Sequence, residues 1–174
     1  MKSILDRFRY GTVLPLTLLV SAAAGLLAAV GLILLPIIAG PSADMRIEPA
    51  GGIILVDKDF TVDIVVESTI PVNVFAGELS YNPDVLDIVS IDYNTSIADL
   101  WAKKPWYENG AGTLEFAGGT TRPGGFWGTD TLLSVTFRAH APGESQLVFH
   151  DTRILQHDGL GTDADVAEPI DVLF

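Results

Sequence analysis

The order of hydrophobic and polar residues changes near residue 44, and each part of the chain predicts a different kind of element. No charged residue occurs between Gly11 and Ala43, and nearly all of this stretch is apolar. A helix of about 20 apolar residues is long enough to span the hydrocarbon core of a bilayer. The sequence therefore predicts a transmembrane helix at residues 11–40, retained as an uncleaved signal anchor.

The residues on either side of this stretch predict its orientation. Residues 1–10 are basic and the following domain is acidic, which places the N terminus in the cytoplasm and the C terminus outside. Residues 41–46 are expected to form a short tether, and residues 47–174 an extracytoplasmic domain at the cell membrane. Small residues near Ala43 also offer a site for signal cleavage, and a cleaved chain would be secreted.

Beyond the apolar stretch, the pattern becomes a period of two, interrupted by frequent turn residues. In Phe60–Val66 and Leu133–Arg138, apolar and polar residues alternate as in a strand with one buried face. Roughly nine short strands are expected, among them Ile53–Val56 and a closing strand at Ile170–Phe174. No apolar stripe of helical period follows, so the sequence predicts an all-β domain, a two-sheet antiparallel β-sandwich.

The clearest local signal lies in Val74–Ile91. Alternation up to Tyr81 predicts a strand, and a turn follows at Asn82 and Pro83. Proline has no amide donor, and an asparagine side chain can bond the backbone two residues on. Leu86–Ile91 then resumes the apolar pattern, which predicts a second strand after the corner.

Two other stretches lack regular alternation and are expected to be irregular. Tyr93–Gly112 contains two lysines and several aromatic residues, and a second loop carries Phe126 and Trp127. Aromatic rings on loops can stack on sugar rings, so a carbohydrate-binding platform is one hypothesis. The alternative is that these rings fold back and cover the open end of the sandwich. The candidate platform residues are Trp101, Trp106, Tyr107, Phe126 and Trp127.

An acidic loop near the C terminus is a candidate calcium site. Asp158, Asp163 and Asp165 lie close together in sequence around two glycines. Carboxylate oxygens at short spacing are ligands that Ca²⁺ prefers, although the spacing is not that of an EF-hand. A solvated turn with no metal is the alternative, and no other cofactor is expected.

Charge and composition narrow the function further. Residues 44–174 carry seven basic and 21 acidic residues, a net charge of −14. Nucleic acid is therefore not expected as a partner, because affinity for phosphate depends on neutralising its charge. The chain has no cysteine, which excludes disulfides, thiol catalysis and cysteine zinc sites. Because no motif of a serine hydrolase, zinc protease or phosphate loop occurs, we assign no catalytic residue and expect no enzyme.

The order of these features resembles the cohesin domain, a jelly-roll β-sandwich related to bacterial carbohydrate-binding modules. Val56–Val62 resembles the family's turn into a valine-rich strand, and Leu79–Leu86 resembles its LxYDPxxL core signature. Leu132–Ala139 resembles its late strand, and the resemblance covers about Ile47–Phe174. Its signature positions here are Phe60, Leu79, Tyr81, Pro83, Leu86, Val135 and Phe137.

The resemblance implies a non-catalytic module that recognises a dockerin-type protein partner at the cell surface. The chain contains one such module and no dockerin-like calcium repeat, so we expect the partner on another chain. No binding residue is transferred, because the family's binding face is not a short motif. Two alternatives remain open, a polysaccharide-binding module that uses the loop aromatics and a structural subunit of a surface filament or envelope layer.

Overall fold

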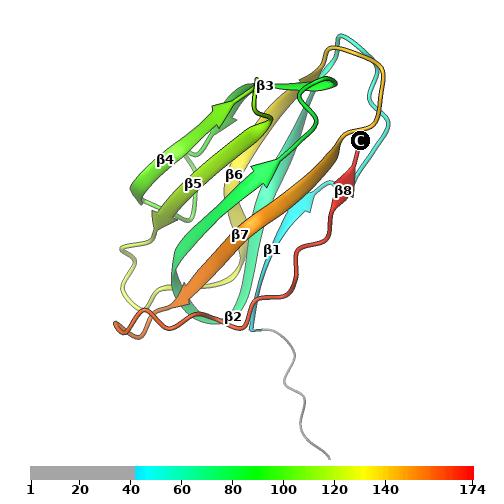
Figure 1. Cartoon of the computed structure of the whole chain (residues 1–174). Coiled ribbons are helices and arrows are strands. Elements are labelled where there is room, and N and C mark those ends of the chain that lie inside the picture. Colours follow the sequence, from blue (N-terminus) through cyan, green and yellow to red (C-terminus); the bar gives the residue numbers. More distant parts are fainter. Residues whose placement is uncertain (1–41) are drawn as a thin grey trace, which may run out of the picture. The chain divides into compact units, whose positions relative to one another are not determined.

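The computed structural model describes residues 42–174, so the predicted transmembrane helix and the basic N terminus lie outside the described part. Within residues 42–174 there is no helix of the length and hydropathy needed to cross a membrane. The strands of this part, coloured along the chain in Figure 1, are β1 (Ala43–Glu48), β2 (Asp59–Ser80), β3 (Leu86–Asp92), β4 (Leu100–Glu108), β5 (Thr113–Gly119), β6 (Phe126–Ala139), β7 (Gln146–Gln156) and β8 (Val172–Leu173).

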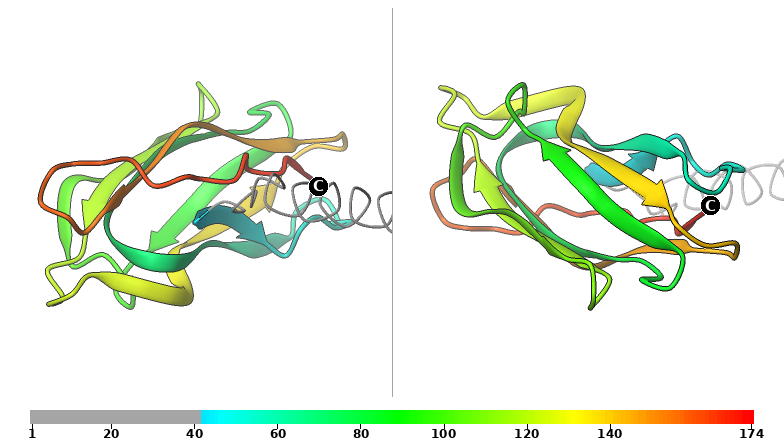
Figure 2. Two further views of the ribbon diagram at one scale, coloured as in Figure 1. Left: turned by 90° about the horizontal axis from the view of Figure 1, so that it is seen from below. Right: turned by 90° about the horizontal axis from the view of Figure 1, so that it is seen from above.

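The long strand β2 belongs to two sheets, because its two halves pair with different neighbours. Residues 59–68 pair with β1 and β6, and β6 pairs in turn with β3. Residues 72–80 pair with β5 and β7, which are flanked by β4 and β8. The sheets are therefore β1-β2-β6-β3 and β4-β5-β2-β7-β8, with antiparallel pairs throughout, and Figure 2 shows the two layers. This arrangement confirms the predicted sandwich.

The change of sheet within β2 occurs around Pro71. The pairing register with β6 shifts between Ser68 and Val72, on either side of this proline. Pro71 has no amide hydrogen to give to a neighbouring strand, and its carbonyl accepts a hydrogen bond from the backbone amide of His157 at 2.9 Å. A proline is tolerated inside a long strand here because the strand changes partners at that point.

The alternation in the sequence directs one side of each strand into a shared core. Val62 and Ile64 of β2 pair with Val135 and Leu133 of β6, and the exposed fraction of all four is 0%. The buried apolar residues form one cluster that extends from β1 to β8. Because residues 42–174 contain a core of their own, they can fold as an independent unit.

The corner after β2 forms as its sequence predicts. The Asn82 side-chain oxygen accepts a hydrogen bond from the Asp84 amide at 3.0 Å, which is the predicted turn. Tyr81 is 5% exposed, and its ring lies edge-on to Phe137 with the ring centres 5.3 Å apart. Gly112, at φ +67°, lies against the same corner, where an added Cβ would be 2.3 Å from the Tyr81 carbonyl oxygen.

The Tyr81 hydroxyl is held by Asn109, which lies just after β4. This hydroxyl donates to the Asn109 side-chain oxygen at 2.7 Å. The same oxygen accepts from the Ile88 amide at 2.8 Å, and the Asn109 amide group donates to the Ile88 carbonyl at 3.1 Å. Burial raises the pKa of Tyr81 to about 12, with a further contribution from the negative charge of Asp87. The chain just after β2, strand β3 and the chain just after β4 are thus joined at one buried point.

The other signature positions of the resemblance also lie in or beside the core. Phe60 is partly buried and stacks on Phe137, with ring centres 5.6 Å apart. Pro83 is in the turn that follows β2. The remaining signature residues, Leu79, Leu86 and Val135, are buried. These residues therefore define the scaffold.

Several predicted boundaries are wrong. Ile53–Val56 is not a strand, and Ile53 is 98% exposed. Residues 43–46 belong to β1 instead of the tether, because they pair with residues 65–68 of β2. The closing strand is limited to β8, since Ile170 is 80% exposed and outside it.

Two stretches that were expected to be irregular contain strands. Tyr93–Gly112 contains β4, whose pairing with β5 shifts register twice, and these shifts disrupt the period of two. Phe126 and Trp127 open β6 instead of lying in a loop.

Candidate functional site

The outer surface of the second sheet is formed by side chains that the strand register places in rows. We call the outward-pointing residues of β4, β5, the second half of β2 and β7 the candidate face. Its rows, read in that strand order, are Leu100–Gly119–Val74–Leu155, Lys103–Ala117–Ala76–Arg153 and Trp106–Glu115–Glu78–His150.

The centre of the candidate face is built from small residues. Ala76 and Ala117 are direct neighbours on adjacent strands, and Gly119 follows two residues after Ala117 on the same side. Short side chains leave the sheet low at this point, and large apolar side chains stand beside it on β4, where Leu100 is 63% and Trp106 is 52% exposed. Exposed aromatic side chains such as Trp106 are enriched in the surfaces through which proteins bind one another.

A hollow of about 380 Å³ lies at one end of this centre, between β4, β5 and β2. The residues that line it are mainly apolar and include the two glycines that end β5. The residues that line it are Asn73, Val74, Leu100, Trp101, Ala102, Gly118, Gly119 and Thr120.

Gly118 fixes the position of β4 at the edge of the candidate face. An added Cβ at Gly118 would lie 2.6 Å from the Trp101 ring, so only glycine leaves room for the indole. Trp101 is thereby turned inward and meets Tyr93 edge-on, with ring centres 5.4 Å apart. Because alternate residues of a strand point to opposite sides, this placement directs Leu100 outward.

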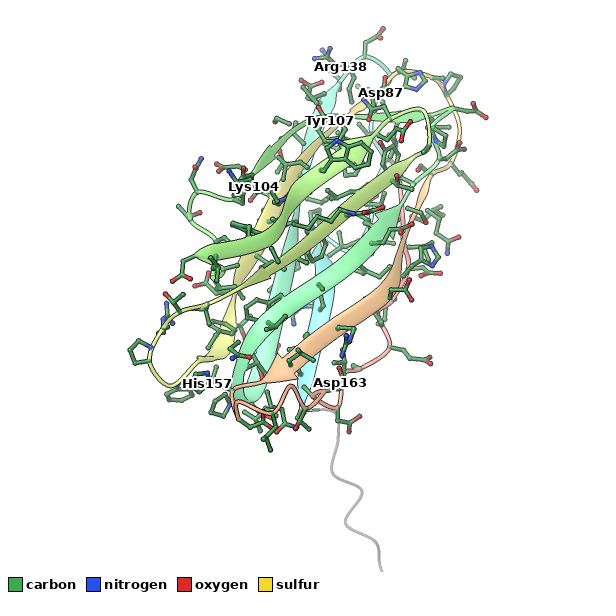
Figure 3. The ribbon with its side chains drawn as sticks, turned by 60° about the vertical axis from the view of Figure 1, so that its left-hand side comes forward. Asp87, Lys104, Tyr107, Arg138, His157 and Asp163 are labelled. Atoms are coloured by element: carbon green, nitrogen blue, oxygen red, sulfur yellow. The ribbon has the colours of Figure 1, made fainter. Side chains whose placement is uncertain are left out.

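Charges on the candidate face are balanced. Lys103 forms an ion pair with Glu115. Arg153 pairs with Asp163 at 2.9 Å, and the Ser80 hydroxyl and the His150 ring form a hydrogen bond at 2.9 Å. Figure 3 shows Lys104, another basic residue of β4, beside this surface. In a domain with a net charge of −14, such a balanced region offers a partner little electrostatic repulsion.

The outer surface of the first sheet, the opposite face, is more polar and more acidic. Arg138 of β6 bonds Asp59 at 2.6 Å, and this contact lowers the pKa of Asp59. The next row joins the hydroxyls of Thr61 and Thr136 at 3.0 Å. The acidic residues of this surface are Asp44, Glu48, Asp59, Asp63, Glu67, Asp87 and Asp92. Arg46 and Arg138 are its basic residues, so the acidic charge is in excess.

The structure does not bring the five candidate platform aromatics together. Trp101 and Tyr107 point inward and pack against the core, and Phe126 is 3% exposed beside Phe75. Trp106 and Trp127 are exposed but belong to different strands, β4 and β6. Three of the five rings therefore cover the core, as the alternative hypothesis predicts. The other two do not form a single platform on which a sugar could stack.

The three acidic residues of the C-terminal loop have separate interactions. Asp158 accepts from the Leu160 amide at 2.8 Å, and its pKa is lowered chiefly by the Thr162 hydroxyl. Asp163 pairs with Arg153, and the Asp165 carbonyl accepts from the Ser42 amide at 2.7 Å. Within residues 42–174 no group of three acidic or histidine side chains is placed to hold a metal ion, so we develop no calcium site.

Sequence reasoning missed the candidate face because it did not recognise β4. A usable signal was present, since Ala76 and Glu78 alternate with buried residues in the same way as Glu115 and Ala117. Small outward residues on two strands predict a smooth surface only when their pairing is known. The structure supplies that register.

Comparison with protein-family models and with curated proteins gave no significant match. Solved structures do match the fold. A non-cellulosomal cohesin from the hyperthermophilic archaeon Archaeoglobus fulgidus superposes with a TM-score of 0.61 at 19% identity, covering 76% of this chain and 89% of the cohesin. The chain therefore has a cohesin-like fold.

Two bacterial cohesins that were solved in complex with dockerins match similarly. One is from a type I cohesin–dockerin complex of Clostridium thermocellum, with a TM-score of 0.63 and 12% identity over 78% of this chain and 93% of the cohesin. The other is the sixth cohesin of scaffoldin B from Acetivibrio cellulolyticus, with a TM-score of 0.60 and 11% identity over 76% of this chain and 96% of the cohesin.

Proposed function

We propose that residues 42–174 form a non-catalytic binding module whose candidate face holds a dockerin-type protein. The observation that carries this proposal is the small-residue, charge-balanced surface around Ala76 and Ala117, bordered by the exposed Trp106. The fold supports the same conclusion, because cohesins with this architecture have been solved as complexes with dockerins.

The physical mechanism is recognition by a preformed surface. Ala76 and Ala117 lie on paired strands whose register is fixed by hydrogen bonds, so binding orders little of the backbone. Trp106 and Leu100 supply apolar area that is exposed in the free protein and buried by the partner. Balanced charges around this centre then set the orientation of the partner.

We also propose that residues 11–40 anchor the chain in the cell membrane, with the binding module outside the cell. The uncharged apolar stretch and the basic residues before it support this location. A protein partner with a dockerin-type module would then be retained at the cell surface.

A binding assay with paired variants tests the function. Residues 42–174 are immobilised and offered a panel of type I and type II dockerin modules. We expect the double variant Ala76→Arg with Ala117→Arg to lose the partner, because two long charged side chains block the centre of the candidate face. Thr61→Arg with Thr136→Arg adds the same charge to the opposite face and should retain it.

The same material on a glycan array tests the carbohydrate alternative. Saturable binding to a polysaccharide that is lost on Trp106→Ala, together with no retention of any dockerin, would replace the proposed function with carbohydrate recognition.

A further inference from the structure

A second apolar surface lies at one end of the sandwich, away from the candidate face. Between β1 and β2 the chain runs through residues 49–58, drawn in cyan in Figure 1 beside the C terminus and the β6–β7 connection. Ile53 is 98%, Leu55 70% and Val56 41% exposed. We call Ile53–Val56 together with the hollows beside it the apolar end.

Two hollows adjoin these exposed side chains. One has a volume of about 270 Å³ between Ile54–Val56, Val85–Leu86 and the β6–β7 connection. The other, of about 240 Å³, lies between Ile53, Leu173 and Gly143. Both are lined by Ile54, Gly143 and Phe174. The apolar end therefore combines projecting apolar side chains with two hollows, and Glu144 is the one charged residue that lines them.

Packing and hydrogen bonds hold the backbone of this segment in place. Ile54 and Phe174 pack against the core, and the Phe174 ring lies 4.9 Å from that of Phe60. The Gly52 amide donates to the Leu173 carbonyl at 3.2 Å, and the Asp57 amide donates to the carbonyl of Ala139 in β6 at 2.7 Å. The segment is thus fixed at both ends, and its exposed residues are displayed by a defined backbone.

We infer that the apolar end is the interface of a homodimer, in which a second copy of this chain packs against it across a two-fold axis. A two-fold interface requires one surface to be complementary to itself. In the proposed dimer, Ile53 and Leu55 of one copy enter the hollows of the other, and the same contacts are repeated across the axis.

The charge of the domain favours a second copy at this place. Two copies with a net charge of −14 repel each other over most of their surfaces. No charged residue occurs from Pro49 to Val56, and Glu144 is the one charged residue that lines the two hollows, so two copies meet few like charges here. The backbone amides of Ile53, Ile54 and Leu55 also lack an acceptor among residues 42–174 and can donate across the interface.

The two proposed surfaces are separate, so each can fail without the other. The apolar end is formed by loops at one end of the sandwich, whereas the candidate face is the outer surface of the second sheet. A dimer of this kind would present two candidate faces to partners and would raise the avidity for a multivalent partner.

Sedimentation equilibrium of residues 42–174 tests the dimer. We expect a reversible monomer–dimer equilibrium, weakened at least about tenfold by Ile53→Glu, because each copy then buries an unpaired charge. Leu160→Glu is the matched control. Leu160 is 85% exposed and lies between His157 and Asp163 at the other end of the domain (Figure 3), so this variant should dimerise like the wild type.

Salt and cross-linking give independent readouts. Added NaCl should strengthen the dimer, because it screens the repulsion between two acidic domains and leaves the apolar contact intact. Since the chain has no cysteine, Ile53→Cys should yield an oxidised dimer at low protein concentration, and Leu160→Cys should not. A wild-type domain that stays monomeric at millimolar concentration, or equal weakening by the two glutamate variants, would overturn the inference.

Discussion

The hydrogen-bonded contact between Tyr81 and Asn109 gives the sharpest test of how the corner after β2 is held. Tyr81→Phe removes a hydroxyl that donates to Asn109 at 2.7 Å. The Asn109 oxygen keeps its second donor, the Ile88 amide, so no acceptor is left unpaired. The expected loss of unfolding free energy is therefore that of one net hydrogen bond, about 1 kcal/mol.

Asn109→Ala is expected to be more damaging, because it removes three hydrogen bonds at once. The Tyr81 hydroxyl and both backbone groups of Ile88 lose their partners. With a cost of about 1 kcal/mol for each group, the loss should be about 3 kcal/mol. Tyr81→Phe made in the Asn109→Ala background should then cost close to nothing, which corresponds to a coupling energy of about 1 kcal/mol between the two residues.

Urea unfolding of residues 42–174, followed by tryptophan fluorescence at neutral pH, measures these differences. Tyr107→Phe is the matched control, because the Tyr107 hydroxyl has no hydrogen-bond partner among the described residues, and it should change stability by less than about 0.5 kcal/mol. The reasoning is refuted if Tyr81→Phe costs the same with and without Asn109, since the hydroxyl would then not act through that side chain.

Three further predictions follow from single contacts. Gly118→Ala should destabilise the fold by about 1–3 kcal/mol in the same urea experiment, because the added Cβ would lie 2.6 Å from the Trp101 ring. Gly110→Ala is the control and should leave stability unchanged, because an added Cβ there has no atom within 4 Å. The pKa of Tyr81 is raised from its ordinary value of 10 to about 12. Its contribution to stability is therefore complete below pH 10 and is lost as pH rises through about 12. An ultraviolet titration should show one tyrosine that ionises at higher pH than the others, and this tyrosine should be missing in Tyr81→Phe. Arg138→Gln should return the lowered pKa of Asp59 toward its ordinary value of 3.8 in an NMR titration. The ion pair stabilises the fold above pH 3.8, and this stabilisation is lost as pH falls through the lowered pKa of Asp59. An unchanged pKa of Asp59 in the variant would contradict the role of the ion pair.

Local chemistry was sufficient for the corner between β2 and β3. Asn82 and Pro83 specify the turn without help from distant residues, and the structure contains the predicted bond to Asp84. The alternation in Phe60–Val66 and Leu133–Arg138 likewise predicts most of the buried residues, because a period of two leaves one arrangement that covers the apolar side. Val65 is the exception, since it lies on the polar side of the pattern and is 6% exposed.

Features that depend on contacts between residues distant in sequence could not be predicted from local patterns. The sequence around Trp101 is typical of an exposed loop, and the ring turns inward because Gly118, on a different strand, leaves space for it. Ile53–Val56 has the composition of a strand but lacks a partner strand, so it remains an exposed segment. The candidate face depends on the pairing of Ala76 with Ala117 across 41 residues of chain, and no local pattern encodes that register.

Photo-cross-linking in cells that produce the full-length chain tests the central claim most directly. A photoreactive amino acid is placed at Ala117 on the candidate face and, as a control, at Thr136 on the opposite face. The proposed function predicts that the Ala117 variant is joined on illumination to a protein that carries a dockerin module, and that the Thr136 variant is not. Cross-linking from Thr136 alone, or from neither position, would contradict recognition of a protein partner by the candidate face.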